Sequence, residues 1–205
     1  MAPQNGQTAL FGGTFNPVHN GHMAILTALK QLPGVTNILV LPTNIPPHKA
    51  AAGVSFEHRF KMCQLAFAGQ KQVTVSNLEQ RLGGKNYTLC TLQALLQQGV
   101  EQPWLAIGGD SLRDFEQWFC YREILKLCRL AVCPRAGVEP AAFERQLGRL
   151  RGLGATVAVL PVQPPQISST KIRALAVAKK PLEGLVPPAV EAYIKLNGLY
   201  LNPAE

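Results

Sequence analysis

The hydrophobic positions of this chain fall into short apolar runs, separated by longer stretches in which apolar residues recur every three or four positions. Short apolar runs are typical of buried strands, and the wider spacing is typical of amphipathic helices. The runs predict six strands, at residues 8–12, 36–41, 72–76, 103–108, 129–133 and 156–160. Because strands and helices alternate, we expect an α/β fold with a doubly wound, mostly parallel sheet and helices on both faces.

Helical spacing appears in four stretches between these strands. Their apolar positions are Ile25, Leu26 and Leu29; Phe56, Phe60, Cys63 and Phe67; Leu89, Leu92, Leu95 and Leu96; and Leu112, Phe115 and Phe119. Side chains at this spacing share one helix face, so each set is expected to pack on the sheet. A last helix is predicted to start at Pro187 and Pro188 and to stop at Asn197 and Gly198.

Length and composition favour one domain. The chain has 205 residues, of which 47% are hydrophobic, enough to bury a core. We expect a single Rossmann-like domain over residues 1–205, in which residues 161–205 form a C-terminal helical part. No apolar run approaches the roughly 20 residues of a membrane span, and the opening lacks a secretory pattern, so a cytoplasmic protein is expected.

The five cysteines give no sign of a disulfide framework or a metal site. Their number is odd, they form no C-x-x-C pair, and they lie mostly within apolar runs. They are therefore predicted to be buried free thiols.

The net charge of +8 indicates an anionic ligand. The basic residues are scattered, and their longest run is the pair Lys179 and Lys180. No aromatic and basic residues interleave as they do on nucleic-acid platforms. This pattern favours small phosphorylated molecules over nucleic acid or an acidic membrane.

The segment FGGTFNPVHNGH, residues 11–22, carries the first candidate site. A predicted strand ends in glycines and a helix starts near Asn20, which places the loop at the carboxyl edge of the sheet, where ligands of open α/β sheets bind. Gly12 and Gly13 allow close approach of the backbone, so N–H groups of Gly13, Thr14 and Phe15 could face phosphate oxygens.

His19 and His22 lie three positions apart at this helix start. Both rings can donate hydrogen bonds to one anion, and the positive end of the helix favours phosphate. Zinc is the alternative, but two histidines lack the third ligand of a catalytic zinc site. A purely structural histidine is the other alternative.

A second segment, ISSTKIR at residues 167–173, follows the last predicted strand and opens another helix. Ser168 or Ser169 can cap that helix, while Ser169 and Arg173 share a face on which a hydroxyl and a guanidinium converge. Such a group suits a polyphosphate. An ordinary serine cap with a solvated arginine is the alternative.

The two segments together resemble a known family. GGTFNPVHNGH matches the G-x-F-x-P-x-H-x-G-H motif of the nucleotidyltransferase superfamily, and ISSTKIR resembles its second motif. Within that superfamily the chain is most similar to the bacterial nicotinate-nucleotide adenylyltransferases, through the segments PTNIPPHK (42–49), NYT (86–88) and IGGDSLRDFEQW (107–118).

The resemblance implies transfer of AMP from ATP to nicotinate mononucleotide, with Mg²⁺ accompanying ATP and no metal held by the protein. It implies that His19 and His22 act at the α-phosphate, and that Ser169, Thr170 and Arg173 hold the β- and γ-phosphates. The catalytic residues are then His19, His22 and Arg173, and the ATP-binding residues are Gly12, Gly13, Thr14, Phe15, Ser168, Ser169, Thr170 and Ile172. A homo-oligomer is compatible with the sequence.

The resemblance also assigns residues to the mononucleotide side, namely Lys49, Tyr87, Thr88, Asp110, Trp118 and Arg135. It implies that Trp118 stacks on the pyridine ring, whereas its place in a helical pattern alone favours core packing. Thr88 and Asp110 could simply cap the helices that follow them, and the helix start at Thr88 could also receive the nicotinate carboxylate.

Some cations and some departures from the family pattern leave alternatives open. His48 and Arg59 are weaker candidates for contacts to phosphate or adenine. Asn16 stands where an aspartate is common, and Cys90 stands where an acidic residue usually follows the tyrosine and threonine. Another adenylyl- or cytidylyltransferase, or a non-catalytic nucleotide-binding protein, is the alternative function.

Overall fold

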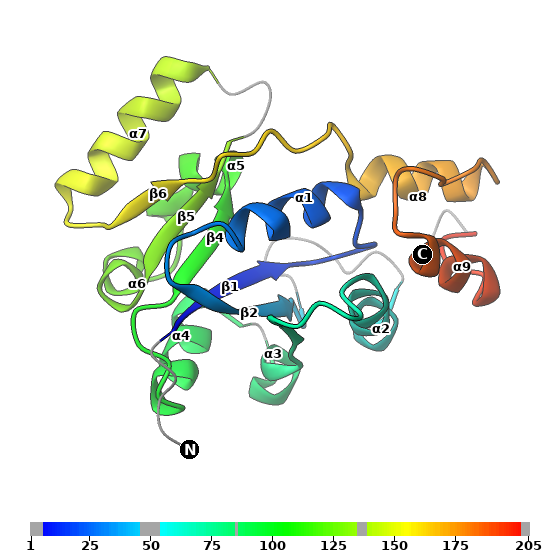
Figure 1. The fold of residues 1–205 in the computed structure, drawn as a ribbon, viewed down its shortest axis with the longest axis horizontal. Helices are drawn as coiled ribbons and strands as arrows, with labels where there is room; N and C mark the ends of the chain where they lie inside the picture. The colour runs from blue at the N-terminus through cyan, green and yellow to red at the C-terminus, as the bar shows by residue number, and fades with distance from the viewer. Residues whose placement is uncertain (1–5, 46–53, 85, 135–138, 202–205) are drawn as a thin grey trace.

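The computed structural model describes residues 6–45, 54–84, 86–134 and 139–201. Its centre is a six-stranded sheet in the order β3-β2-β1-β4-β5-β6, and every neighbouring pair is parallel (Figure 1). The strands are β1 (Gln7–Gly13), β2 (Val35–Pro42), β3 (Val73–Val75), β4 (Trp104–Gly108), β5 (Arg129–Cys133) and β6 (Val157–Val159). All six predicted strands are therefore confirmed, each to within one residue at either end, and so is the doubly wound fold.

Helices connect the strands and cover both faces of the sheet (Figure 1). They are α1 (Asn20–Leu29), α2 (Phe56–Ala66), α3 (Leu78–Leu82), α4 (Thr88–Gln97), α5 (Gly109–Arg113), the 3-10 turn η1 (Phe115–Gln117), α6 (Tyr121–Leu127), α7 (Pro140–Gly152), α8 (Ser169–Val177) and α9 (Pro188–Leu196). Helices α1, α2, α8 and α9 share one hydrophobic cluster, and α3 to α7 share the other. No helix within these described residues is long and apolar enough to cross a membrane.

The alternation of side-chain direction along the central strands explains why there are two hydrophobic clusters, one on each face of the sheet. In β1, Ala9 and Phe11 face the α1 side, while Leu10 between them faces the α4 side. In β5, Ala131 and Leu130 divide in the same way. Successive strand residues point to opposite faces, so an apolar run in a covered strand supplies both cores at once.

The fourth predicted helix, with Leu112, Phe115 and Phe119 on one face, is wrong as a single element. Helix α5 ends at Arg113, Trp118 is extended (φ −70°, ψ 140°), and Cys120 adopts a left-handed conformation (φ 51°). Leu112 and Phe115 are buried as expected, but the side chain of Phe119 is 54% exposed because the chain turns before it. Leu96, at the end of α4, is also largely exposed rather than packed on the sheet.

The prediction of buried thiols holds for three of the five free cysteines. Cys63, Cys128 and Cys133 are buried, and burial raises the pKa of each thiol, to about 12 for Cys128 and about 11 for Cys133. Cys90 and Cys120 are exposed, which corrects the prediction for these two. Cys90 lies in α4 and Cys120 directly precedes α6, and neither belongs to the two hydrophobic clusters on the sheet.

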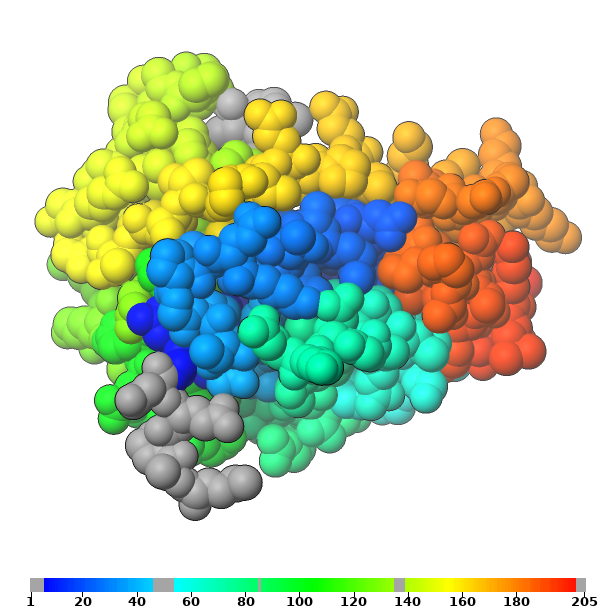
Figure 2. Space-filling view, viewed as in Figure 1, coloured from blue at the N-terminus to red at the C-terminus, as the bar shows by residue number. Residues whose placement is uncertain are grey.

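The order of the strands in the sheet predicts where a ligand would bind. The chain runs outward from β1 to β2 and β3, and then returns to place β4 on the other side of β1. The carboxyl ends of β1 and β4 therefore border the crevice that open α/β sheets use for ligands. The C-terminal helices α8 and α9, orange and red, lie against α1 and α2 beside this end of the sheet (Figure 2).

Candidate active site

The loop between β1 and α1, residues 14–19, is built on a buried aromatic ring. Phe15 is 2% exposed and takes a left-handed backbone conformation (φ 49°), which is unusual for a residue with a side chain. Its ring makes edge contacts with Phe11 at 5.3 Å and His22 at 4.9 Å between ring centroids. A Cβ on Gly12 would meet no protein atom within 4 Å, so the loop presents open backbone there.

His19 and His22 lie together at the start of α1, as the sequence predicts. Their rings stack with centroids 3.7 Å apart, and the Nδ1 atom of His22 accepts a hydrogen bond from the backbone N–H of His19 at 3.0 Å. A Cβ on Gly21 would lie only 3.0 Å from the His19 ring. A side chain at this position would therefore crowd the ring of His19, and the glycine between the histidines leaves room for it.

The environment of His22 keeps its imidazole neutral. Desolvation by burial, and then the neighbouring His19, lower the pKa of His22 well below its usual value. Because Nδ1 accepts the His19 N–H, the single ring proton of the neutral form sits on Nε2. His22 can thus present a fixed N–H donor to an anion without becoming charged.

Helix α8 docks directly onto the β1–α1 loop. Ser168 caps the helix by accepting the N–H of Lys171 at 3.2 Å. Ser169 Oγ donates to the carbonyl of Pro17 at 2.9 Å, and Arg173 Nη1 donates to the carbonyl of Asn16 at 2.8 Å. The two predicted motifs, about 150 residues apart in the chain, are therefore in direct contact.

These contacts also limit what some α8 residues can offer a nucleotide. Ile172 is fully buried, and its N–H donates to the carbonyl of Ser168 within the helix, so its predicted contact to ATP has no free side-chain surface. Thr170 Oγ1 accepts a weak hydrogen bond from Arg173 Nη2 at 3.3 Å. The contacts of Ser169, Thr170 and Arg173 to phosphates stay predictions.

Arg59 joins the β1–α1 loop to the chain that leaves β2. Its side chain is buried in α2, where Nη1 donates to the carbonyls of Thr14 at 2.8 Å and Thr43 at 2.7 Å, and Nη2 donates to the carbonyl of Asn44 at 2.9 Å. Arg59 is in no ion pair found among the described residues. It therefore braces two loops rather than offering its guanidinium to a ligand, which corrects its interpretation as a ligand contact.

The residues predicted for the mononucleotide side lie at the start of α4 and in the segment after β4. Thr88 is the first residue of α4, and the cap position belongs to Tyr87, so the prediction of Thr88 as N-cap is wrong. Tyr87 is exposed, and its ring lies 4.8 Å from that of Phe119. Trp118 is partly buried against Phe115 at 5.1 Å. The structure thus brings the segments around residues 87 and 118 together, as expected.

Asp110 lies in the first turn of α5, directly after β4, at the carboxyl edge of the sheet. The N-cap of this short helix is Gly108, so the prediction of Asp110 as the cap is wrong. Lys49 and Arg135 of the predicted set, together with His48, lie outside the described residues.

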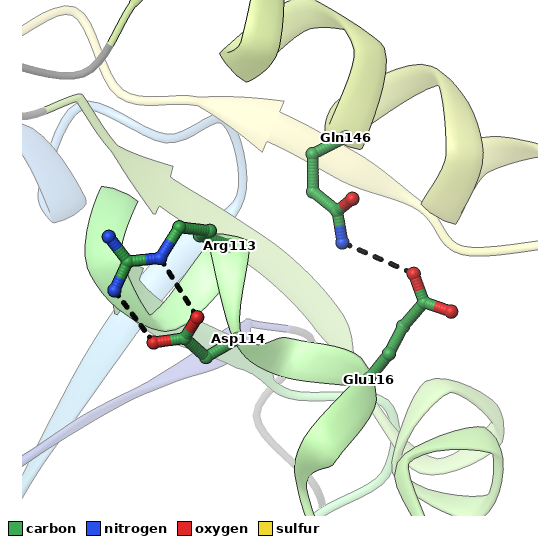
Figure 3. Close-up of polar contacts among 4 residues, drawn as sticks. All are labelled: Arg113, Asp114, Glu116 and Gln146. Atoms are coloured by element: carbon green, nitrogen blue, oxygen red, sulfur yellow. Dashed lines mark hydrogen bonds and ion pairs between the residues drawn. The ribbon is translucent and has the colours of Figure 1, made fainter.

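The segment that carries Trp118 is tied to α7 through Glu116. Glu116 forms an ion pair with Arg149, in which Nε lies 2.6 Å from Oε1 and Nη2 donates a hydrogen bond to Oε2 at 2.9 Å, and Gln146 donates a further hydrogen bond to Oε1 at 3.4 Å. Figure 3 shows the Glu116–Gln146 contact, together with the pairing of Arg113 and Asp114 that precedes the 3-10 turn. The turn that precedes Trp118 is therefore held by α7.

Known proteins are similar to this chain in sequence and in fold. A cytidylyltransferase-like family model matches residues 10–175. A relative from Synechococcus sp. strain JA-3-3Ab, named probable nicotinate-nucleotide adenylyltransferase, is 38% identical over 207 residues and covers 98% of each chain. The chain belongs to the nicotinate-nucleotide adenylyltransferase family.

Two further adenylyltransferases extend this comparison. A relative from Thermotoga maritima with the same name is 33% identical, covering 91% of this chain and 90% of its own. The structure of Plasmodium falciparum nicotinic acid mononucleotide adenylyltransferase complexed with NaAD superposes with a TM-score of 0.80 over 98% of this chain and 100% of that one. At 16% identity, that likeness supports the fold.

Glu79 in α3 contacts two of the segments that the family resemblance assigns to the substrate, at Asn44 and at Asn86. Its partly buried carboxylate accepts the backbone N–H of Asn44 at 3.3 Å, and its carbonyl accepts a hydrogen bond from Asn86. Burial raises the pKa of Glu79 to about 7, although the Asn44 contact and the cation of Arg59 both act to lower it. Glu79 does not stand out in the sequence, because it looks like an ordinary charged residue of a surface helix, and Arg59 stands out only as a weak candidate for a ligand contact.

This raised pKa predicts a pH-dependent gain in stability for Glu79→Gln. The folded protein keeps the proton up to about pH 7, whereas the unfolded chain releases it near 4.5, so ionisation increasingly favours unfolding between these values. Glutamine removes this penalty and still offers an acceptor to Asn44. We expect the variant's advantage in free energy of unfolding to be about 2 kcal/mol larger at pH 8 than at pH 4.5.

Urea denaturation at the two pH values measures this difference. Glu101→Gln, at an exposed position, is the matched control and should show the same small effect at both. An advantage of Glu79→Gln that does not change with pH would contradict the raised pKa.

Proposed function

We propose that the chain transfers the AMP group of ATP to the phosphate of nicotinate mononucleotide, releasing pyrophosphate. The observation that carries this proposal is the docking of α8 on the β1–α1 loop at the point where the strand order reverses. Membership of the nicotinate-nucleotide adenylyltransferases supports the choice of substrates. Proposed partners are therefore these two small molecules and not nucleic acid.

The proposed reaction needs positioning rather than a covalent intermediate. A phosphate oxygen of the mononucleotide forms a bond to the α-phosphorus of ATP, and the bond from that phosphorus to the bridging oxygen of the β-phosphate breaks, with both electrons leaving on pyrophosphate. The attacking oxygen is already anionic, so no general base is required. The chain's contribution is to align the two phosphates and to stabilise the charge that develops on them.

The residues of the site fit these tasks. The open backbone of Gly12 and the stacked rings of His19 and His22, the second with its proton on Nε2, belong to one segment, where the α-phosphate is proposed to sit. The N-terminus of α8 adds a positive helix end, and Arg173 adds a cation, on the side where pyrophosphate is proposed to leave.

Magnesium is proposed to arrive bound to the phosphates of ATP. The donors around the β1–α1 loop are imidazoles, a guanidinium, hydroxyls and backbone N–H groups, which suit an anion and are poor ligands for Mg²⁺. Within the described residues no group of three His, Cys, Asp or Glu side chains could hold a metal ion. Bound in this way, the ion would neutralise charge on the triphosphate.

A substrate panel tests the reaction and its specificity together. The purified chain is incubated with Mg²⁺, ATP or CTP, and nicotinate or nicotinamide mononucleotide, and the products are identified by mass spectrometry. We expect a dinucleotide and pyrophosphate with ATP, and at least a tenfold higher kcat/KM for nicotinate mononucleotide, because its carboxylate can meet the N–H groups at the start of α4.

The other outcomes separate the alternatives. Equal efficiency with both mononucleotides would contradict carboxylate recognition at α4. Product only with CTP, or nucleotide binding without any pyrophosphate, would replace the proposed reaction with a cytidylyltransferase or a non-catalytic nucleotide-binding protein.

A further inference from the structure

Tyr200 reaches the β1–α1 loop from the far end of the described chain. Its hydroxyl donates a hydrogen bond to Asn16 Oδ1 at 2.7 Å, across 184 positions of sequence. The side chain is 1% exposed, and its backbone is left-handed (φ 64°), in a turn that follows α9 and Gly198. Residue 200 lies beyond the 10–175 range that the cytidylyltransferase-like model matches.

The residue that Tyr200 contacts lies at the centre of the loop. The carbonyl of Asn16 accepts from Arg173, and the next carbonyl, of Pro17, accepts from Ser169. Three donors from the C-terminal part of the chain therefore hold two consecutive loop residues. His19, whose N–H orients the ring of His22, follows two positions after Pro17.

The phenol of Tyr200 is a permanent donor in this place. Burial raises its pKa above the usual value, and the cations of Arg173 and Arg59 offset only part of that effect. The hydroxyl therefore stays protonated at neutral pH. A side-chain amide oxygen at residue 16 is a suitable acceptor for it.

The loop needs such support because its conformation is not the one its sequence prefers. Phe15 is held at a positive φ, a conformation that persists only where the surrounding structure determines it. Removing one of the donors that fix the adjacent residue would let the loop relax. The imidazoles of His19 and His22, three and six positions after Asn16, would then lose their proposed alignment with the phosphates.

We propose that Tyr200 is a positioning residue for adenylyl transfer, acting through Asn16 to fix the backbone that carries His19 and His22. This inference rests on the proposed function for its kinetic consequence. Its structural consequence, the placement of the two imidazoles, stands apart from the reaction and can be measured separately.

Tyr200→Phe tests the proposal because it removes only the hydroxyl and keeps the buried ring. The matched control is Tyr193→Phe in α9, where the lost hydroxyl contacts His58 Nδ1 at 2.9 Å instead of the loop. We expect Tyr200→Phe to lower kcat by about 5- to 20-fold while both KM values stay within about twofold, because binding contacts are kept and alignment is lost. Tyr193→Phe should retain wild-type kcat.

Imidazole NMR signals provide the second readout. In ¹H–¹⁵N spectra of the ligand-free chain, Tyr200→Phe should shift the ring signals of His19 and His22 and leave those of His58 in place, while Tyr193→Phe should do the reverse. Assignments of three of the four histidines come from His22→Gln, His48→Gln and His58→Ala, and the remaining signal belongs to His19. Unmoved His19 and His22 signals, or a kcat equal to that of Tyr193→Phe, would overturn the proposal.

The two readouts keep this proposal distinct from the proposed function. If the wild-type chain forms no dinucleotide but Tyr200→Phe still shifts the signals of His19 and His22, the reaction is wrong and the positioning contact is right. If the wild-type chain is active and Tyr200→Phe is equally active, the positioning role fails and the reaction stands.

Discussion

Replacing His22 with alanine should lower kcat/KM for dinucleotide synthesis by about 30- to 1,000-fold, the equivalent of about 2 to 4 kcal/mol of transition-state stabilisation. The ring holds its proton on Nε2 because Nδ1 is occupied by the N–H of His19. A donor fixed in this way is already oriented when charge develops on the α-phosphate, and alanine supplies neither the donor nor the acceptor that orients it.

The two nitrogens of His22 can be tested separately with amides. In His22→Gln the amide nitrogen can reach the position of Nε2, and in His22→Asn the amide oxygen can replace Nδ1 as acceptor. If donation from Nε2 is the catalytic contribution, the glutamine variant should retain more activity than the asparagine variant. The reverse order would assign His22 to shaping the loop.

A histidine outside the site serves as the control for this prediction. His58 lies in α2 and contacts Tyr193. His58→Ala should keep at least about half of the wild-type kcat/KM, and thermal denaturation should show that His22→Ala remains folded. Wild-type turnover in His22→Ala would remove this residue from the catalytic site.

Replacing Arg59 with methionine should cost about 3 to 5 kcal/mol of folding stability, and lower kcat/KM at least tenfold at a temperature where the variant is still folded. The guanidinium makes three hydrogen bonds to the carbonyls of Thr14, Thr43 and Asn44. Methionine fills a similar volume but donates nothing, so the β1–α1 loop and the chain after β2 lose their common anchor.

Lys61→Met makes a similar change at an exposed position of the same helix. Urea denaturation should give a free energy of unfolding for this control within about 0.5 kcal/mol of the wild type. Arg59→Lys keeps the charge but cannot span three carbonyls, so it should fall between the methionine variant and the wild type. A methionine variant as stable and active as the control would show that the two loops are held by other contacts.

Much of the fold follows from local patterns in the sequence. The six strands could be predicted because each is a short apolar run. Parallel strands that are buried on both faces have such continuous runs in place of an alternation of apolar and polar residues. The loop of residues 14–19 and its histidines could be placed because the glycines end a strand and α1 begins at Asn20, as expected. The contact between the two motifs followed from the shared chemistry of a phosphate site.

The segment after β4 shows where local patterns fail. Leu112, Phe115 and Phe119 have helical spacing, but Trp118 leaves the helix and Cys120 turns the chain with a positive φ. No glycine or proline marks this break in the sequence. Tertiary contacts, among them the pairing of Glu116 with Arg149 of α7, outweigh the helical preference of the segment.

The bracing contacts of Arg59 and the contact of Tyr200 could not be found from the sequence for a different reason. Each acts through contacts with residues 15 or more positions away, and in each case the partner is a backbone carbonyl or an amide oxygen. Backbone carbonyls are present at every position of a chain, and side-chain amides are common in loops. The sequence therefore does not indicate which of them Arg59 or Tyr200 contacts. Only the folded arrangement shows which arginine and which tyrosine are used.

Asn16 and Tyr200 are far apart in the sequence, so the ribosome synthesises the loop residue long before the residue that contacts it. Strand β1 and the loop after it leave the ribosome early, while the donor that completes the loop is synthesised some 184 residues later. Contacts between distant parts of a chain form late because loop closure must come first. A nascent chain can therefore assemble much of its sheet before Tyr200 is available to hold the β1–α1 loop.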